Sequence, residues 1–113
     1  MAWWRARGTA ALTSPRSIQT WVEAVENVLL RRPIIYTYAS FWNSTLAGSR
    51  RFDDYFLWIA DYGNRPSPRL PAGRTGCEMW QFSQTGSVPG IVGNVDLDRF
   101  SGSLDDLTAL ADG

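Results

Sequence analysis

The chain has 113 residues, which is room for one small domain. Its 11 basic and 11 acidic residues cancel to a net charge of zero, so neither nucleic acid nor an anionic membrane surface is predicted as a partner. Histidine is absent and Cys77 is the one cysteine, which excludes Ser–His–Asp and Cys–His catalysis, His-ligated zinc and an intrachain disulfide. Carboxylates, tyrosines and amides remain for chemistry, and no cofactor or metal is predicted.

The N-terminal stretch MAWWRARGTAAL contains arginines but no apolar core of signal-peptide length. No apolar run reaches the roughly 18 residues expected of a transmembrane helix. We therefore expect a soluble chain without an export signal.

Residues 14–33, SPRSIQTWVEAVENVLLRRP, predict a helix. Ser14 can cap it, Pro15 suits the first helical position because no backbone donor is needed there, and Pro33 closes it. The apolar residues at helical spacing, which are expected to share one face, are Ile18, Trp21, Val22, Val25, Val28 and Leu29.

Four β-branched or aromatic runs follow this helix and predict strands. They alternate with helical or long loop segments, which is typical of parallel βα units. The predicted fold class is α/β: a partial (β/α) barrel with about four parallel-type strands and intervening helices and loops, or half of a barrel of about 250 residues. The strands are expected at 33–38, 55–63, 77–84 and 91–100, a short helix before Gly48, and a last helix at 102–113 capped by Ser103.

Three strings stand in order along the chain: RRPIIYTYASFW, LWIADYG and WQFSQTGSVPGIVGNVDLDRF. Together they resemble the C-terminal half of the glycoside hydrolase family 25 lysozymes, the Chalaropsis type. The similarity runs from about Thr13 to about Leu107. The chain is accordingly divided into an atypical N-terminal segment, 1–12, and a lysozyme-like half barrel, 13–113.

The resemblance implies a muramidase that cuts between N-acetylmuramic acid and N-acetylglucosamine in peptidoglycan. Its fold would be an irregular α/β barrel with the substrate groove at the C-terminal ends of the strands. It also implies peptidoglycan glycan strands as the partner and an extracellular or cell-wall location.

Asp96 is the predicted catalytic residue. From the residues alone, its alternation with Val95 and Leu97 reads as a strand residue facing water. The resemblance instead implies a place in the catalytic groove, because the late VD strand of the family matches Asp96. Asp98 stands where the family often has asparagine and is interpreted as a turn or cap residue.

Five residues are predicted to bind substrate. Tyr36 and Tyr38 alternate to one face: Tyr36 is the better match to the family motif, whereas Tyr38 is nearer the strand end where barrel sites lie. Trp58 is either barrel core or a sugar-stacking platform. The resemblance also selects Gln81, and Asp61 either lines the groove or turns the chain. Trp21, Trp42 and Trp80 are expected to be packing residues.

The family's principal acid is the glutamate of an Asp-x-Glu motif, and the matching stretch here, MAWWRARGTAAL, has no acidic residue. We therefore expect little or no lysozyme activity from this chain alone. Three hypotheses stay open: a lysozyme domain that lost its N-terminal half, a non-catalytic sugar-binding module, or a structural remnant. A half barrel would also leave residues 33–38 unpaired on one side and expose apolar faces that invite self-association, although low solubility is the plainer expectation.

Overall fold

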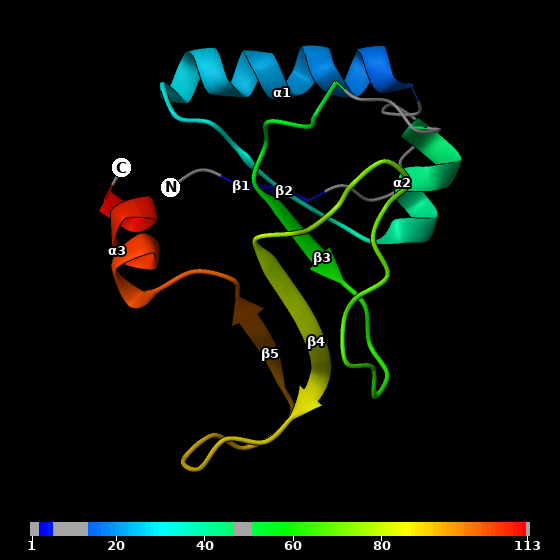
Figure 1. Cartoon of the computed structure of the whole chain (residues 1–113). Helices are drawn as coiled ribbons and strands as arrows, with labels where there is room; N and C mark the ends of the chain where they lie inside the picture. The colour runs from blue at the N-terminus through cyan, green and yellow to red at the C-terminus, as the bar shows by residue number, and fades with distance from the viewer. Residues whose placement is uncertain (1–2, 6–13, 47–50, 113) are drawn as a thin grey trace.

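The computed structural model describes residues 3–5, 14–46 and 51–112, the first of these segments by its backbone only. They form one five-stranded sheet with helices beside it (Figure 1). In sheet order the strands are β1 (Trp3–Arg5), β2 (Ile34–Thr37), β3 (Leu57–Ala60), β4 (Met79–Gly86) and β5 (Val95–Phe100). The helices are α1 (Pro15–Leu29), α2 (Ala39–Leu46) and α3 (Leu104–Asp112).

The predicted α/β class is confirmed, but the last strand has the opposite orientation to the one expected. Strands β1 to β4 pair in parallel, whereas β5 pairs antiparallel with β4. The reason is the length of the connection: residues 87–94 are too few for a parallel crossover, which needs about a dozen residues or more. The chain therefore returns as a hairpin, which projects from the rest of the sheet in Figure 1.

Strand β1 was not predicted, and it changes the expected edge of the sheet. Its residues pair in parallel with β2, with Trp3 opposite Ile34 and Arg5 opposite Tyr36. The backbone of β2 therefore has a partner on the side that was expected to be open. The remainder of segment 1–12 lies outside the described residues, as does Gly48, the expected end of α2.

Helix α1 begins as predicted and ends earlier. The Ser14 hydroxyl accepts a hydrogen bond from the backbone N–H of Ser17 at 3.1 Å, and Pro15 is the first helical residue. The helix stops at Leu29 because Leu30 adopts a left-handed conformation with φ 55°, so Pro33 is not its end.

The predicted apolar face of α1 is only partly buried. Ile18 and Val22 are buried, whereas Trp21 is 37% exposed and Val28 is 80% exposed. Trp21, which was expected to be a packing residue, is thus partly covered, while Trp42 and Trp80 are buried as expected.

The hydrophobic core lies between one face of the sheet and helices α1 and α2. Ile35 of β2 and Leu57 and Ile59 of β3 point into it, and each is at most 1% exposed. The other core members are Ile18 and Val22 of α1, Phe41, Trp42 and Leu46 of α2, and Phe52. Because side chains alternate along a strand, Tyr36 and Trp58 point to the opposite face.

Helix α3 follows β5 and packs loosely. Ser103 caps it as predicted, with its hydroxyl accepting from the Asp106 N–H at 3.0 Å. None of its residues is buried, and Arg31 donates to the Ala111 carbonyl at 3.4 Å beside the end of α1. Within the described segments, no helix combines the length and apolar character needed to cross a membrane.

Candidate active site

A row of polar and aromatic side chains crosses the sheet on the face away from the core. Backbone register places Tyr36 of β2 beside Trp58 of β3, and Gln81 of β4 beside Asp98 of β5. The rings of Tyr36 and Trp58 meet edge to face, with centroids 4.9 Å apart at an angle of 68°. We call Tyr36, Trp58, Gln81 and Asp98 the polar face.

Gln81 joins two tyrosines in this row. Its Oε1 accepts hydrogen bonds from the Tyr36 hydroxyl and from the Tyr62 hydroxyl, the latter at 2.9 Å. Gln81 is only 3% exposed, so both bonds lie largely out of water. Since both hydroxyls donate to the oxygen, the amide nitrogen is the donor end of the side chain. Tyr62 follows β3 and was missed in the sequence, although it stands directly after Asp61 in the LWIADYG string.

Asp98 is a member of this row and is not the turn or cap residue that the sequence suggested. It lies within β5, and its Oδ1 accepts a hydrogen bond from the Trp58 indole N–H at 2.8 Å. Burial raises the pKa of the Asp98 carboxyl above its ordinary value; the negative charge of Asp96 adds to this rise, and the indole N–H opposes it.

Asp96 lies two residues earlier on the same strand. Because β5 is antiparallel, its first residues lie at the C-terminal end of β4, with Val95 opposite Gly86. Asp96 is therefore at the sheet end where barrel enzymes place their sites, and it is exposed to solvent. Its catalytic role stays a prediction.

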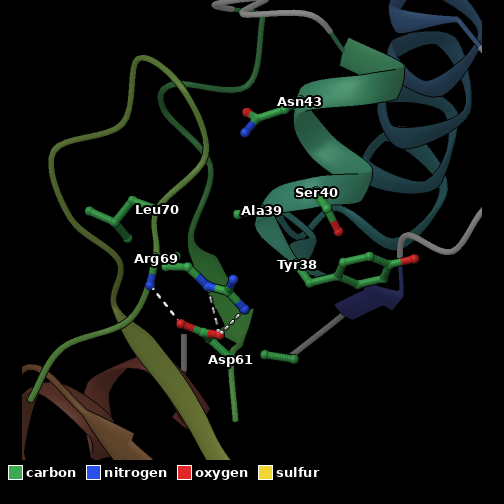
Figure 2. A pocket seen from close by; sticks show the side chains of 8 residues that line it. Tyr38, Ala39, Ser40, Asn43, Asp61, Arg69 and Leu70 are labelled. Atoms are coloured by element: carbon green, nitrogen blue, oxygen red, sulfur yellow. Dashed lines mark hydrogen bonds and ion pairs between the residues drawn. The ribbon is translucent and has the colours of Figure 1, made fainter. Parts of the chain in front are cut away.

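A pocket of about 290 Å³ opens at the C-terminal ends of β2 and β3 (Figure 2). Two of the predicted binding residues, Tyr38 and Asp61, line it, together with Asn43 of α2 and Arg69. Tyr38 is 44% exposed, and in Figure 2 its ring points away from Asp61. This pocket adjoins the polar face, because Ala60 pairs with Gln81 and Asp61 follows Ala60 directly.

Asp61 binds Arg69, which lies with Leu70 on the loop that lines this pocket. Its carboxylate accepts two hydrogen bonds at 2.8 Å, from the Arg69 backbone N–H and from the guanidinium, and Arg65 lies 3.6 Å away. Burial alone would raise the pKa of Asp61, but the hydrogen bonds and charge of Arg69 hold it below its ordinary value. Its backbone oxygen also accepts from the Trp80 indole at 2.9 Å.

Neither a metal cluster nor a reactive thiol emerges from this geometry. Residues 14–46 and 51–112 contain no group of three or more His, Cys, Asp or Glu side chains that could hold a metal ion. Cys77 is half-buried, and burial followed by the charge of Glu78 raises the pKa of its thiol, which disfavours the nucleophilic thiolate.

Comparison with known proteins finds one matching family and several relatives. The profile of the glycosyl hydrolases family 25 matches residues 6–91. Lysozyme M1 of Streptomyces globisporus is 39% identical over 82 residues, which are 72% of this chain and 28% of that protein. The uncharacterized protein YegX of Escherichia coli K12 is 37% identical over 99 residues, which are 87% of this chain and 34% of that protein.

Solved structures agree in fold. The bacterial lysozyme from Streptomyces coelicolor superposes with a TM-score of 0.76 and 30% identity, over 95% of this chain and 52% of that chain. The muramidase from Acremonium alcalophilum superposes with a TM-score of 0.70 and 28% identity, over 88% of this chain and 48% of that chain. The chain thus spans about a third of the curated relatives' length and about half of these solved chains.

Proposed function

The chain belongs to the glycosyl hydrolases family 25, and on this premise we propose that the polar face and Asp96 are part of a muramidase site for peptidoglycan glycan strands. One observation carries the proposal: aromatic rings, an amide and the Asp98 carboxylate form a row across β2 to β5, and Asp96 lies two residues before Asp98 on β5. The site would accordingly act at the bacterial cell wall.

The chemistry of this row suits a sugar ring. The Trp58 indole offers a flat apolar surface. Gln81 stays within the predicted binding region, but at 3% exposed it is assigned to holding the Tyr36 and Tyr62 hydroxyls in place. Glycoside hydrolysis usually takes two carboxyl groups, one that protonates the leaving oxygen and one that stabilises the positive sugar. We assign Asp96 to the second role, because it is exposed and lies at the C-terminal end of β4.

Tyr38 and Asp61 receive different roles at the neighbouring pocket. Tyr38 is assigned to substrate contact, since 44% of it is exposed on the pocket wall. Asp61 remains within the predicted binding region, but its bonds to Arg69 favour shaping the pocket over touching a sugar directly.

The residues assigned so far do not include the carboxylic acid that would protonate the leaving oxygen. The first 22 residues contain no Asp or Glu, and the first acidic residue, Glu23, lies on α1. Residues 13–113 are assigned to the C-terminal half of the family domain, in keeping with their match to 52% of the S. coelicolor lysozyme. We therefore propose that the 113-residue chain binds the wall by itself and hydrolyses it weakly or not at all. This keeps a non-catalytic binding module as the alternative function.

Self-association is proposed through the outer strands. In the described sheet, β1 and β5 are the two edges, and an edge strand presents backbone groups that pair readily with another chain. Analytical ultracentrifugation across a concentration series tests this, and a monomer at every concentration would contradict it.

Co-sedimentation with insoluble peptidoglycan tests the proposed function. We expect the folded chain to be retained and Trp58→Ala to lose retention, whereas Trp21→Ala, a matched change of a 37% exposed tryptophan on α1, keeps it. Equal retention of both variants would contradict the assigned site. If the wild-type chain releases reducing ends, Asp96→Asn should lower that rate by about a hundredfold or more, because it removes the charge that would stabilise the positive sugar.

A further inference from the structure

The hydrogen bond between Trp58 and Asp98 spans three strands. Trp58 is on β3, Asp98 is on β5, and β4 lies between them in the sheet. Asp98 is in register with Gln81, and Trp58 with Met79, so the indole must extend across β4 to reach the carboxylate. On its other side the indole meets the Tyr36 ring, 4.9 Å away between centroids. The ring is thus held from both sides.

We propose that Asp98 is a positioning residue, which holds the Trp58 indole across the polar face as a preformed platform for one sugar ring of the glycan. This inference rests on the proposed function. A carboxylate is a strong acceptor for the indole N–H, so it fixes the ring orientation before the ligand arrives. Fixing a side chain in advance lowers the ordering cost of binding.

The same contact would make the platform sensitive to protonation. Asp96 is the charged neighbour on β5, while the groups that β4 and β3 present, Gln81 and Trp58, carry no charge. Protonation of Asp98 replaces a charge-assisted acceptor by a weaker neutral one. The indole is then expected to be held less firmly at low pH.

Two variants separate positioning from other roles. Asp98→Asn keeps an acceptor oxygen of the same shape and removes the charge, whereas Asp98→Ala removes the acceptor. Asp105→Asn, on the exposed first turn of α3, is the matched control. The readouts are the indole ¹H–¹⁵N resonance of Trp58, identified by its loss in Trp58→Phe, and retention on insoluble peptidoglycan.

We expect Asp98→Ala to shift the Trp58 resonance and to lower peptidoglycan affinity by about threefold to tenfold. Asp98→Asn keeps a neutral acceptor, so it should lower affinity less than Asp98→Ala does. In the wild type the resonance should move with pH, with a midpoint above the ordinary aspartate value because the pKa of Asp98 is raised, and in Asp98→Asn this titration should vanish.

Three outcomes would overturn the inference. If the Trp58 resonance is the same in Asp98→Ala and in the wild type, the hydrogen bond between Trp58 and Asp98 does not form in solution. Affinity lost without any change of that resonance would mean that Asp98 acts otherwise than through Trp58. If both Asp98 variants are retained on peptidoglycan as well as the wild type, the platform alone is overturned. If the folded wild-type chain is not retained at all, the proposed function is overturned as well.

Discussion

The two faces of the sheet carry different chemistry, although the same short strands build both. On β3, Leu57 and Ile59 are at most 1% exposed against the helices, while Trp58 between them turns to the polar face. The core face is held by packing of apolar side chains. The polar face is held by directed hydrogen bonds between strands, including Trp58 to Asp98 and Tyr36 to Gln81.

This difference separates stability from function within a few residues. Apolar packing is nondirectional and depends on buried area, so it tolerates shifts of orientation better than it tolerates lost volume. A hydrogen-bonded row depends on direction and distance, so a small change there alters what the face can bind. Substitutions on the core face should therefore lower stability most, and substitutions on the polar face should lower binding most.

The largest loss of stability is expected on the core face. Ile59 is 0% exposed, and Ile59→Ala should lower the free energy of unfolding by about 2–5 kcal/mol through lost burial and a cavity. The variant at the neighbouring residue, Trp58→Phe, should destabilise the chain less than Ile59→Ala does, but should weaken peptidoglycan binding more. Urea unfolding and co-sedimentation measure the two effects. The comparison fails if Trp58→Phe proves the more destabilising of the pair.

An exposed apolar residue provides the control for this pair. Val92 lies in the β4–β5 loop and is fully exposed at 102%. Val92→Ala should change the free energy of unfolding by no more than about 0.5 kcal/mol.

The loop beside the polar face depends on a buried charge rather than on packing. Arg69→Ala removes the guanidinium bonds to Asp61 and leaves a carboxylate that is 4% exposed with fewer donors. We expect Arg69→Ala to lower the urea midpoint at neutral pH, by less than a fully buried pair would because the Arg69 side chain is itself 66% exposed. Arg16→Ala, an exposed arginine on α1, should be nearly neutral; an equal loss in both variants would argue against a specific role of the Asp61 contact.

The pH dependence of this pair has a defined sign. The folded pKa of Asp61 lies below the unfolded value, which is about 3.9 for aspartate. Its contribution is therefore complete above that unfolded value and is lost as pH falls through the folded pKa. Arg69→Ala should consequently differ most from the wild type near neutral pH and converge with it in acid. A gap that widens on acidification would contradict this assignment.

Gln81 is expected to give a smaller loss of stability with a larger loss of binding. Gln81→Leu leaves the hydroxyls of Tyr36 and Tyr62 without their shared acceptor, which should cost about 1–2 kcal/mol. Tyr62→Phe should cost less, because Tyr36 still donates to Gln81. Comparing the two variants by urea unfolding and peptidoglycan retention tests whether Gln81 is the centre of the row, and a larger effect of Tyr62→Phe would show that it is not.

Helix α1, which covers the core face, was predictable from local sequence signals, although only Ile18 and Val22 of its expected apolar face are buried. The contacts of the polar face were not predictable. Ser14, Pro15 and the spacing of Ile18 and Val22 predict α1 because caps and helical periods are local signals. The antiparallel orientation of β5 also has a local signal, because the short connection at 87–94 cannot hold a parallel crossover.

The side-chain contacts of the polar face had no such signal. Asp98 bonds a residue 40 positions earlier, and Tyr36 bonds one 45 positions later. Alternation placed Asp98 on the same side as Asp96, but only the assembled strand order reveals that the Trp58 indole can reach it. Its interpretation as a turn residue was therefore wrong for lack of long-range information. The Asp61–Arg69 contact likewise depends on how the loop after β3 folds back.

The smallest effect is expected where the hairpin brings Asp96 to the sheet. The β4–β5 register is irregular between Ser83 and Gly86, and a side chain at Gly86 would place its Cβ 2.5 Å from the Leu97 side chain. Gly86→Ala should cost about 1 kcal/mol, at the low end for overpacking because Leu97 is partly exposed and can turn away.

The matched variant is Gly76→Ala, whose added Cβ would meet nothing within 4 Å. It should be neutral or stabilising by up to about 1 kcal/mol, since it restricts the unfolded chain without a clash. Because Leu97 lies between Asp96 and Asp98, Gly86→Ala should also weaken peptidoglycan retention while the Trp58 resonance stays close to that of the wild type. If the Trp58 resonance moves as much as it does in Asp98→Ala, the hairpin irregularity orients the whole polar face. If neither retention nor the resonance changes, the position of Asp96 depends on β5 and not on the irregularity at Gly86.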